Sequence, residues 1–150
     1  MKLKACASLA TAGAYFLSRL NPQTTLLTAA TGQWQPVELA TWLTTVAAQL
    51  LERPIFLGAK EHVAARLIAS PVPEAIVNER RRKARTNAQK KGYTPSHAHL
   101  ALLAWNLCGT NVPHPIWKTT AVIKVYPLRW QSEISQPHYT SRKGLSRPAA

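Results

Sequence analysis

The sequence predicts a mixed α/β fold, because segments with helical spacing of apolar residues alternate with short apolar runs. The clearest helical segment runs from Pro36 to about Leu51, where a proline suited to the first helical position precedes apolar residues spaced three or four apart. The clearest strands are residues 55–57 and 62–69, and the stretch 58–60 between them contains a glycine and predicts a hairpin. A length of 150 residues suits one domain.

The N-terminal part of the chain predicts one further helix and one further strand. Residues 3–11 predict a short helix that Gly13 ends, and the continuous apolar run 14–20 is typical of a buried strand. A secretory signal is the alternative for this region, because residues 1–4 carry two lysines and an apolar stretch follows. The stretch continues into the predicted strand without a cleavage region, and two cysteines are too few for a disulfide framework, so we expect a cytoplasmic protein.

The C-terminal half predicts a long helix, a strand and a final helix. Residues 73–91 have helical character, and residues 99–107 are apolar enough for a buried strand. The final helix is predicted over residues 117–134. It contains Pro127, which would kink a helix from inside, so this helix either bends at Tyr126 or begins there.

Basic residues dominate the charge of the chain. Lys and Arg number 19 against six acidic residues, which gives a net charge of +13. This charge favours polyanions, through long-range attraction and through release of counterions from phosphates, and makes nucleic acid the leading partner. An anionic membrane surface is the alternative, but a membrane-spanning helix needs about 20 consecutive apolar residues and the sequence has no such run.

The predicted helix 73–91 carries the densest positive charge. Between positions 80 and 91 the chain has seven basic residues and no acidic one, and Gly92 follows as a C-terminal cap. The seven are Arg80, Arg81, Arg82, Lys83, Arg85, Lys90 and Lys91. Beyond Val77 only two alanines are apolar, so we expect the helix to bury little surface. Its basic residues either contact a phosphate backbone or form a solvated helix face.

Three polar residues share one stripe of the final predicted helix. Tyr126 precedes Arg129 by three residues, and Glu133 follows Arg129 by four. A guanidinium can hold phosphate oxygens with two parallel hydrogen bonds, and a carboxylate can ligate Mg²⁺ or Mn²⁺, so the stripe could bind a phosphodiester. The plainer interpretation is an exposed ion pair between Arg129 and Glu133 beside a half-buried tyrosine.

The pattern Tyr126-x2-Arg129-x3-Glu133 resembles the signature of DDE-type transposases of bacterial insertion sequences, in the branch whose last acidic residue follows a Tyr and an Arg. Blocks in the same order upstream resemble the same family, and the resemblance covers about residues 5–134. These blocks are residues 66–69, 72–74, 80–85, 100–107 and 110–113. Mere binding of nucleic acid does not require such a set of ordered blocks.

The resemblance implies a partial ribonuclease-H-like α/β fold that includes part of a β-containing insertion and is truncated at the N-terminus. It implies that Glu133 is the catalytic, metal-binding carboxylate and that Tyr126 and Arg129 contact DNA. In the intact family two Mg²⁺ or Mn²⁺ ions support phosphoryl transfer on DNA, at transposon ends and target, and the partner includes a second copy of the protein.

Two departures from the family pattern limit what this chain is expected to do. It contains no aspartate, so the two other carboxylates of the family are missing, and a lone Glu133 cannot supply the ligands of two divalent ions. The family also places a lysine seven residues beyond this glutamate, where the chain has Thr140. We therefore predict a partial catalytic domain over 1–134 that binds no metal and is inactive alone, followed by an unrelated or disordered tail over 135–150.

A small basic nucleic-acid-binding protein without catalysis is the alternative function. It would use the basic residues of helix 73–91 as its contact surface. A metal site made by His97, His99, Cys108 and His114 is disfavoured, because their spacing matches no recurring zinc pattern. The tryptophans within apolar patterns are expected in the core rather than in base stacking.

Overall fold

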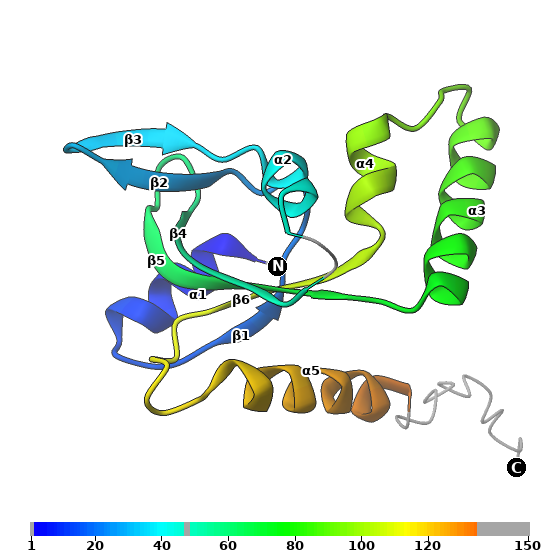
Figure 1. The fold of residues 1–150 in the computed structure, drawn as a ribbon. Helices are drawn as coiled ribbons and strands as arrows, with labels where there is room; N and C mark the ends of the chain where they lie inside the picture. Colours follow the sequence, from blue (N-terminus) through cyan, green and yellow to red (C-terminus); the bar gives the residue numbers. More distant parts are fainter. Residues whose placement is uncertain (1, 47–48, 135–150) are drawn as a thin grey trace, which may run out of the picture.

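The structure is a computed structural model, which describes residues 2–46 and 49–134, with side chains as far as Tyr126. Its described part contains a six-stranded antiparallel sheet in the order β1-β6-β5-β4-β2-β3 (Figure 1). The strands are β1 (Leu17–Arg19), β2 (Leu26–Ala30), β3 (Gln33–Pro36), β4 (Leu51–Leu57), β5 (Val63–Pro71) and β6 (Trp105–Thr110). The predicted tail over 135–150 lies outside the described residues.

Helices cover both faces of this sheet. They are α1 (Leu3–Thr11), α2 (Leu39–Thr44), α3 (Glu74–Lys90), α4 (His97–Leu102) and α5 (Thr119–Ile134). Residues of α1 and α2 join the larger apolar core on one face, and α5 packs against the opposite face. The long helix α3 lies at one side of the molecule, beside α4 (Figure 1). The mixed α/β class that the sequence predicts is thus confirmed.

Strand β5 contributes to both cores because successive side chains of a strand point to opposite faces. Residues 63, 65, 67 and 69 belong to the larger core, whereas Ile68 packs with Cys108, Val122 and Tyr126 beneath α5. Its pairing with β4 runs from Leu51↔Ala69 to Leu57↔Val63, which confirms the predicted hairpin. Gly58 begins the turn with φ +86°, a conformation that few residues other than glycine adopt readily.

Two helices agree closely with the sequence prediction. The short helix predicted over residues 3–11 is α1, and Gly13 follows it with φ +72°. The long helix predicted over residues 73–91 is α3, whose end is closed by a hydrogen bond from the Tyr93 amide to the Ala88 carbonyl, 3.0 Å long, around Gly92. The final helix is α5 and begins at Thr119, which excludes a start at Tyr126.

The predicted helix from Pro36 to Leu51 is largely wrong. Pro36 ends β3 and pairs with Leu27, and α2 occupies only Leu39–Thr44. The cause is a hairpin between β2 and β3 that the sequence pattern did not predict. Its turn at Thr31 and Gly32 has φ values of 49° and 77°, a pair of positive values typical of tight hairpin turns.

The predicted strand over residues 99–107 is also wrong in its first half. Residues 97–102 form α4, and the strand β6 begins at Trp105. The Ser96 side chain accepts a hydrogen bond of 3.1 Å from the His99 amide, which caps the start of a helix. This local cap, together with burial of Leu102 against the larger core, favours a helical turn over an extended strand.

The predicted strand 14–20 is shorter than expected and forms the edge strand β1, which pairs with β6. The side chains of Thr110 and Asn111, at and just after the end of β6, bind the main chain of residues 14–16, which leads into β1. The Asn111 side chain accepts from the Phe16 amide at 2.7 Å and donates to the Ala14 carbonyl at 3.0 Å. The fully buried Thr110 hydroxyl donates to the Phe16 carbonyl at 2.6 Å. These bonds place β1, and with it Arg19, beside α5.

Candidate nucleic-acid interface

The basic residues of α3 divide into two groups with different roles. Arg80 faces the core side of the helix, where its guanidinium donates to the carbonyls of Leu103 and Trp105, both at 3.3 Å, and to Asn106 Oδ1 at 2.8 Å. Arg81 donates to the Leu100 carbonyl at 3.2 Å. Both arginines therefore hold α3 against α4, the start of β6 and the short connection between them, a structural role that the charge pattern alone did not predict.

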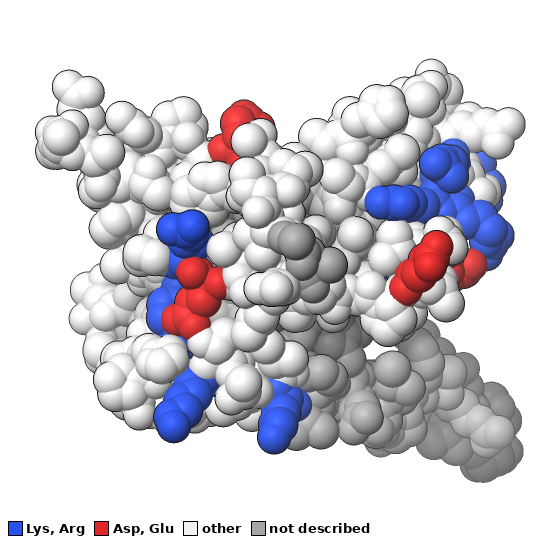
Figure 2. All heavy atoms as spheres, in the orientation of Figure 1, with Lys and Arg blue, Asp and Glu red and all other residues white. Residues whose placement is uncertain are grey.

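The other basic side chains of α3 are exposed. Arg82 forms an ion pair of 2.9 Å with Glu79, and Lys83 lies 3.4 Å from the same carboxylate. The hydrogen bond from Arg82 and the nearby positive charges lower the pKa of Glu79 to about 2. Figure 2 shows basic side chains gathered over α3 with acidic atoms beside them. Glu79 thus partly neutralises the predicted run of cations at Arg82 and Lys83.

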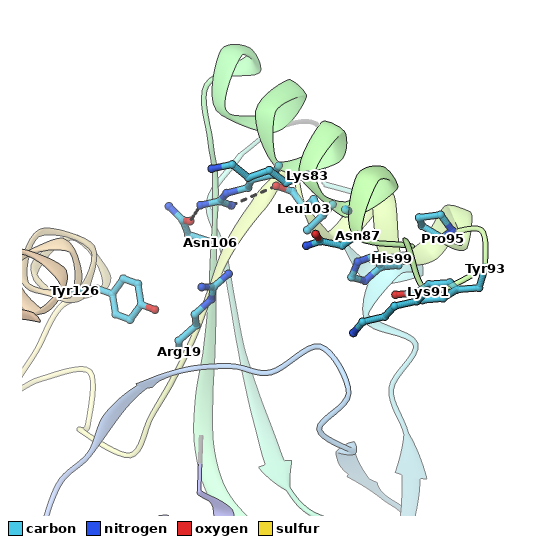
Figure 3. A pocket seen from close by; sticks show the side chains of 12 residues that line it. Arg19, Lys83, Asn87, Lys91, Tyr93, Pro95, His99, Leu103, Asn106 and Tyr126 are labelled. Carbon is cyan, nitrogen blue, oxygen red and sulfur yellow. Dashed lines mark hydrogen bonds between the residues drawn. The ribbon is translucent and has the colours of Figure 1, made fainter. Parts of the chain in front are cut away.

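A cleft of about 710 Å³ lies between α3, β1 and α5. Its lining includes Arg19, Arg80, Lys83, Asn87, Lys91 and Tyr126. In Figure 3 Tyr126 and Arg19 lie at one end of this cleft and Tyr93, Pro95 and His99 at the other. The helix α3 contributes residues 80, 83, 84 and 87 to the lining, and Lys91 follows directly after its last residue; these positions recur every three or four residues along one side of the helix. From this spacing, the sequence could have indicated which residues of α3 line the cleft.

The described lining of the cleft is basic, although one of its lysines, Lys83, also lies 3.4 Å from the Glu79 carboxylate. No Asp or Glu of the described residues belongs to its lining, although two arginines and two lysines do. Burial, and then the positive charge of Arg19 nearby, lower the pKa of Arg80, while Tyr126 acts in the opposite direction. A guanidinium keeps its proton in proteins in spite of such a shift, so Arg80 stays positively charged in the cleft.

Tyr126 is the one residue of the Tyr-Arg-Glu pattern whose side chain is described. It is buried, packs with Val122 against Ile68 and Cys108, and also reaches the cleft. The helical backbone of α5 carries residues 129 and 133 at the predicted three- and four-residue steps. The side chains of Arg129 and Glu133 lie outside the described part, so their roles stay predictions.

A polar cluster that the sequence pattern did not reveal fixes the start of α5. The Arg66 guanidinium donates to Glu52 Oε1 at 2.7 Å, to the Val112 carbonyl at 2.8 Å and to the Trp117 carbonyl at 2.9 Å. Thr119 donates to the other oxygen of Glu52. The cluster connects β4 and β5 to the first turn of α5 and so positions the helix that carries Tyr126. The sequence signal for this cluster was Arg66, a single charged residue within the mostly apolar strand β5.

The described residues contain no group of carboxylates that would fit a two-metal site. The chain has no aspartate, and among the described glutamates Glu52 is bonded to Arg66 and Glu79 to Arg82. Within the described ranges no three His, Cys, Asp or Glu side chains lie close enough together to hold an ion. His97 and His99 lie on α4, whereas Cys108 is buried beneath α5.

Comparisons with family models, curated proteins and solved structures gave no match to this chain. In the part of the chain that the structure describes, no helix combines the length and the apolar character needed to span a bilayer.

Proposed function

We propose that this chain binds DNA through the cleft between α3, β1 and α5, and that it derives from a DDE-type insertion-sequence transposase. One observation carries the binding proposal. Arg19, Arg80, Lys83 and Lys91, from two distant parts of the sequence, line one cleft whose described lining has no acidic residue. Phosphodiester groups are the anions that such a cleft would bind along a polymer.

The guanidinium of Arg80 is held in place by hydrogen bonds, which favours DNA binding over a solvated helix face. Three hydrogen bonds to protein acceptors already restrict its side chain, so little conformational entropy remains to be lost when an anion binds. The lysines at positions 83 and 91 are exposed and supply further charge along the same side of α3. The net charge of +13 would steer a polyanion towards the molecule.

The transposase origin is supported by the ordered sequence blocks and by the helix that carries the Tyr126, Arg129 and Glu133 positions. In this proposal the antiparallel sheet corresponds to the β-containing insertion of a ribonuclease-H-like domain. Glu133 is the remaining family carboxylate, Tyr126 and Arg129 are DNA contacts, and the protein acts in the cytoplasm with transposon ends, target DNA and a second copy as partners. This chain alone is expected to have no strand-transfer activity, because it lacks aspartate.

DNA binding is tested by fluorescence anisotropy with a labelled duplex over a series of salt concentrations. Lys83→Ala is expected to weaken binding and to reduce the slope of log affinity against log salt by about 0.9 for each phosphate that the lysine had neutralised. Lys60→Ala is the matched control, since Lys60 is an exposed lysine in the β4–β5 turn and does not line the cleft. Equal effects of the two substitutions would show that only net charge matters and would contradict the proposed interface.

A nucleic-acid-binding protein without catalytic ancestry is the second candidate, favoured by the absence of aspartate. Incubation with Mn²⁺ and an end-containing duplex tests the expected inactivity, and cleavage that disappears in Glu133→Ala after stringent purification would contradict it. Translation of the DNA upstream of Met1 separates the two origins. Two aspartate-bearing strand motifs there would support the transposase, and their absence in every frame would favour the second candidate.

A further inference from the structure

A second groove adjoins the cationic cleft. It encloses about 590 Å³ between the segment after β1, the start of α2 and α4. Tyr93, Pro95 and His99 line both spaces, so the groove continues the cleft past these three side chains. In Figure 3 the same three residues lie together at the end of the cleft opposite Tyr126.

The two spaces differ in chemistry. The lining of the groove includes no Lys or Arg of the described residues and contains one carboxylate, Glu38, so it does not suit a phosphate. Apolar side chains from β2, α2 and α4 form its floor, where the buried Leu26 and Leu39 and the partly buried Leu102 belong to or pack against the larger core. Amide and hydroxyl groups are present at Gln23 and Thr24. A nucleobase makes apolar contact through its faces and hydrogen bonds through its edges, and carboxylates accept hydrogen bonds from base amino groups.

Tyr93 lies where the cleft and the groove meet, and its exposed side chain extends from backbone that is fixed by a hydrogen bond. The residue is 57% exposed although it follows directly on the capped end of α3. Its amide is fixed by the 3.0 Å hydrogen bond to the Ala88 carbonyl, and Gly92 provides the left-handed turn before it. An exposed ring on fixed backbone is suited to stacking against a base, because little chain freedom is lost on contact.

We propose that the two spaces together bind single-stranded DNA, with phosphates in the cationic cleft and a base in the adjoining groove against Tyr93. This inference rests on the DNA binding proposed above and specifies the form of DNA. The cleft has the volume of a small-molecule site, which suits one or two nucleotides rather than the side of a duplex. A cationic path combined with aromatic stacking is the general arrangement by which proteins bind single strands.

The test measures anisotropy of a labelled single strand of about twelve nucleotides, a duplex of the same sequence, and a strand with abasic sites in place of its bases. The intact protein is expected to bind the single strand more tightly than the duplex and the abasic strand about tenfold more weakly. Tyr93→Ala is expected to weaken binding of the intact strand about tenfold and to leave the abasic strand unchanged. Tyr93→Phe should retain the affinity, because it keeps the ring.

The matched control is Tyr15→Ala, which removes another tyrosine, 54% exposed, from the loop before β1. Circular dichroism verifies that each variant is folded. Equal binding of intact and abasic strands, a preference for duplex, or equal effects of the two alanine variants would overturn the single-strand inference while the proposed DNA binding stands. Failure of the unaltered chain to bind any of the three probes at low salt would overturn the proposed function itself.

Discussion

Replacement of Arg66 by methionine tests what holds α5 against the sheet. Methionine keeps the apolar stem of the side chain and removes the guanidinium, which donates to Glu52 at 2.7 Å and to two main-chain carbonyls at 2.8 and 2.9 Å. Arg66 and Glu52 are only 14% and 27% exposed, so the ion pair is partly shielded from water. After the substitution, Glu52 keeps its hydrogen bond from Thr119 but loses the ion pair with Arg66.

The expected loss of unfolding free energy is about 2 to 4 kcal/mol. Hydrogen bonds to charged groups contribute about 1.5 to 3 kcal/mol each, but their sum overstates the effect because the released carbonyls regain water. With a slope of about 2 kcal/mol per molar urea, the denaturation midpoint falls by about 1 to 2 M. The assay is urea unfolding followed by circular dichroism.

Arg53→Met is the matched control, because Arg53 lies on the neighbouring strand β4 and is exposed, with its guanidinium 5.9 Å from the Trp42 ring. Its loss is expected to cost less than about 1 kcal/mol. A loss below about 0.5 kcal/mol for Arg66→Met, or equal losses for both variants, would refute the assigned role of Arg66.

The same ion pair predicts a dependence on pH. Burial raises the pKa of Glu52, but hydrogen bonds from Thr119 and Arg66 and the charges of Arg66 and His114 outweigh it, so the pKa lies below its usual value of 4.5. A lowered pKa in the folded state means that the charged form stabilises the fold above the unfolded pKa and that this contribution is lost as pH falls through the folded pKa. The difference between the unaltered chain and Arg66→Met is therefore expected to shrink below pH 4.5.

Three further outcomes are expected. Burial raises the pKa of Cys108 to about 12, so at pH 8 its thiol should react with a disulfide reagent only after denaturant is added, and prompt reaction in the folded protein would contradict its burial. Gly58→Ala should lower the free energy of unfolding, measured in urea, by about 1 to 3 kcal/mol, because φ is +86° and the added methyl would meet side-chain atoms at 2.5 Å. Gly32→Ala should lower it less, because φ is +77° but the added methyl would meet open space. Thr110→Val should lower unfolding free energy by about 1 to 3 kcal/mol, since the buried Phe16 carbonyl loses its donor, and a neutral result would contradict that bond.

The sequence predicted those parts of the fold that local signals determine. The β4–β5 hairpin, α1 and α3 follow from apolar periodicity and from glycines at their ends. The β2–β3 hairpin was missed because its turn uses Thr31, which rarely takes a positive φ, in place of a recognisable turn pair. The apolar run of α4 predicts a strand as readily as a helix, because short apolar runs do not distinguish the two.

The candidate interface was predictable only in part. The basic residues were evident, and the spacing of Arg80, Lys83 and Lys91 could have indicated that all three lie along one side of α3 and its end. Arg19 could not have been placed with them, because its position depends on antiparallel pairing of β1 with β6, where Arg19 lies opposite Cys108. Pairing between segments so distant in sequence leaves no local pattern in either of them.

The core beneath the first half of α5 is the smaller of the two, so this side of the cleft is expected to open before the rest of the molecule unfolds. Among the side chains that the structure describes, that core has four buried members, Ile68, Cys108, Val122 and Tyr126, whereas the larger core on the other face has fourteen. Segments with few buried apolar neighbours exchange their amide hydrogens through local opening. Amides of α5 from Thr119 to Tyr126 should therefore exchange before those of β4 and β5, and an anion bound against Tyr126 should slow that exchange.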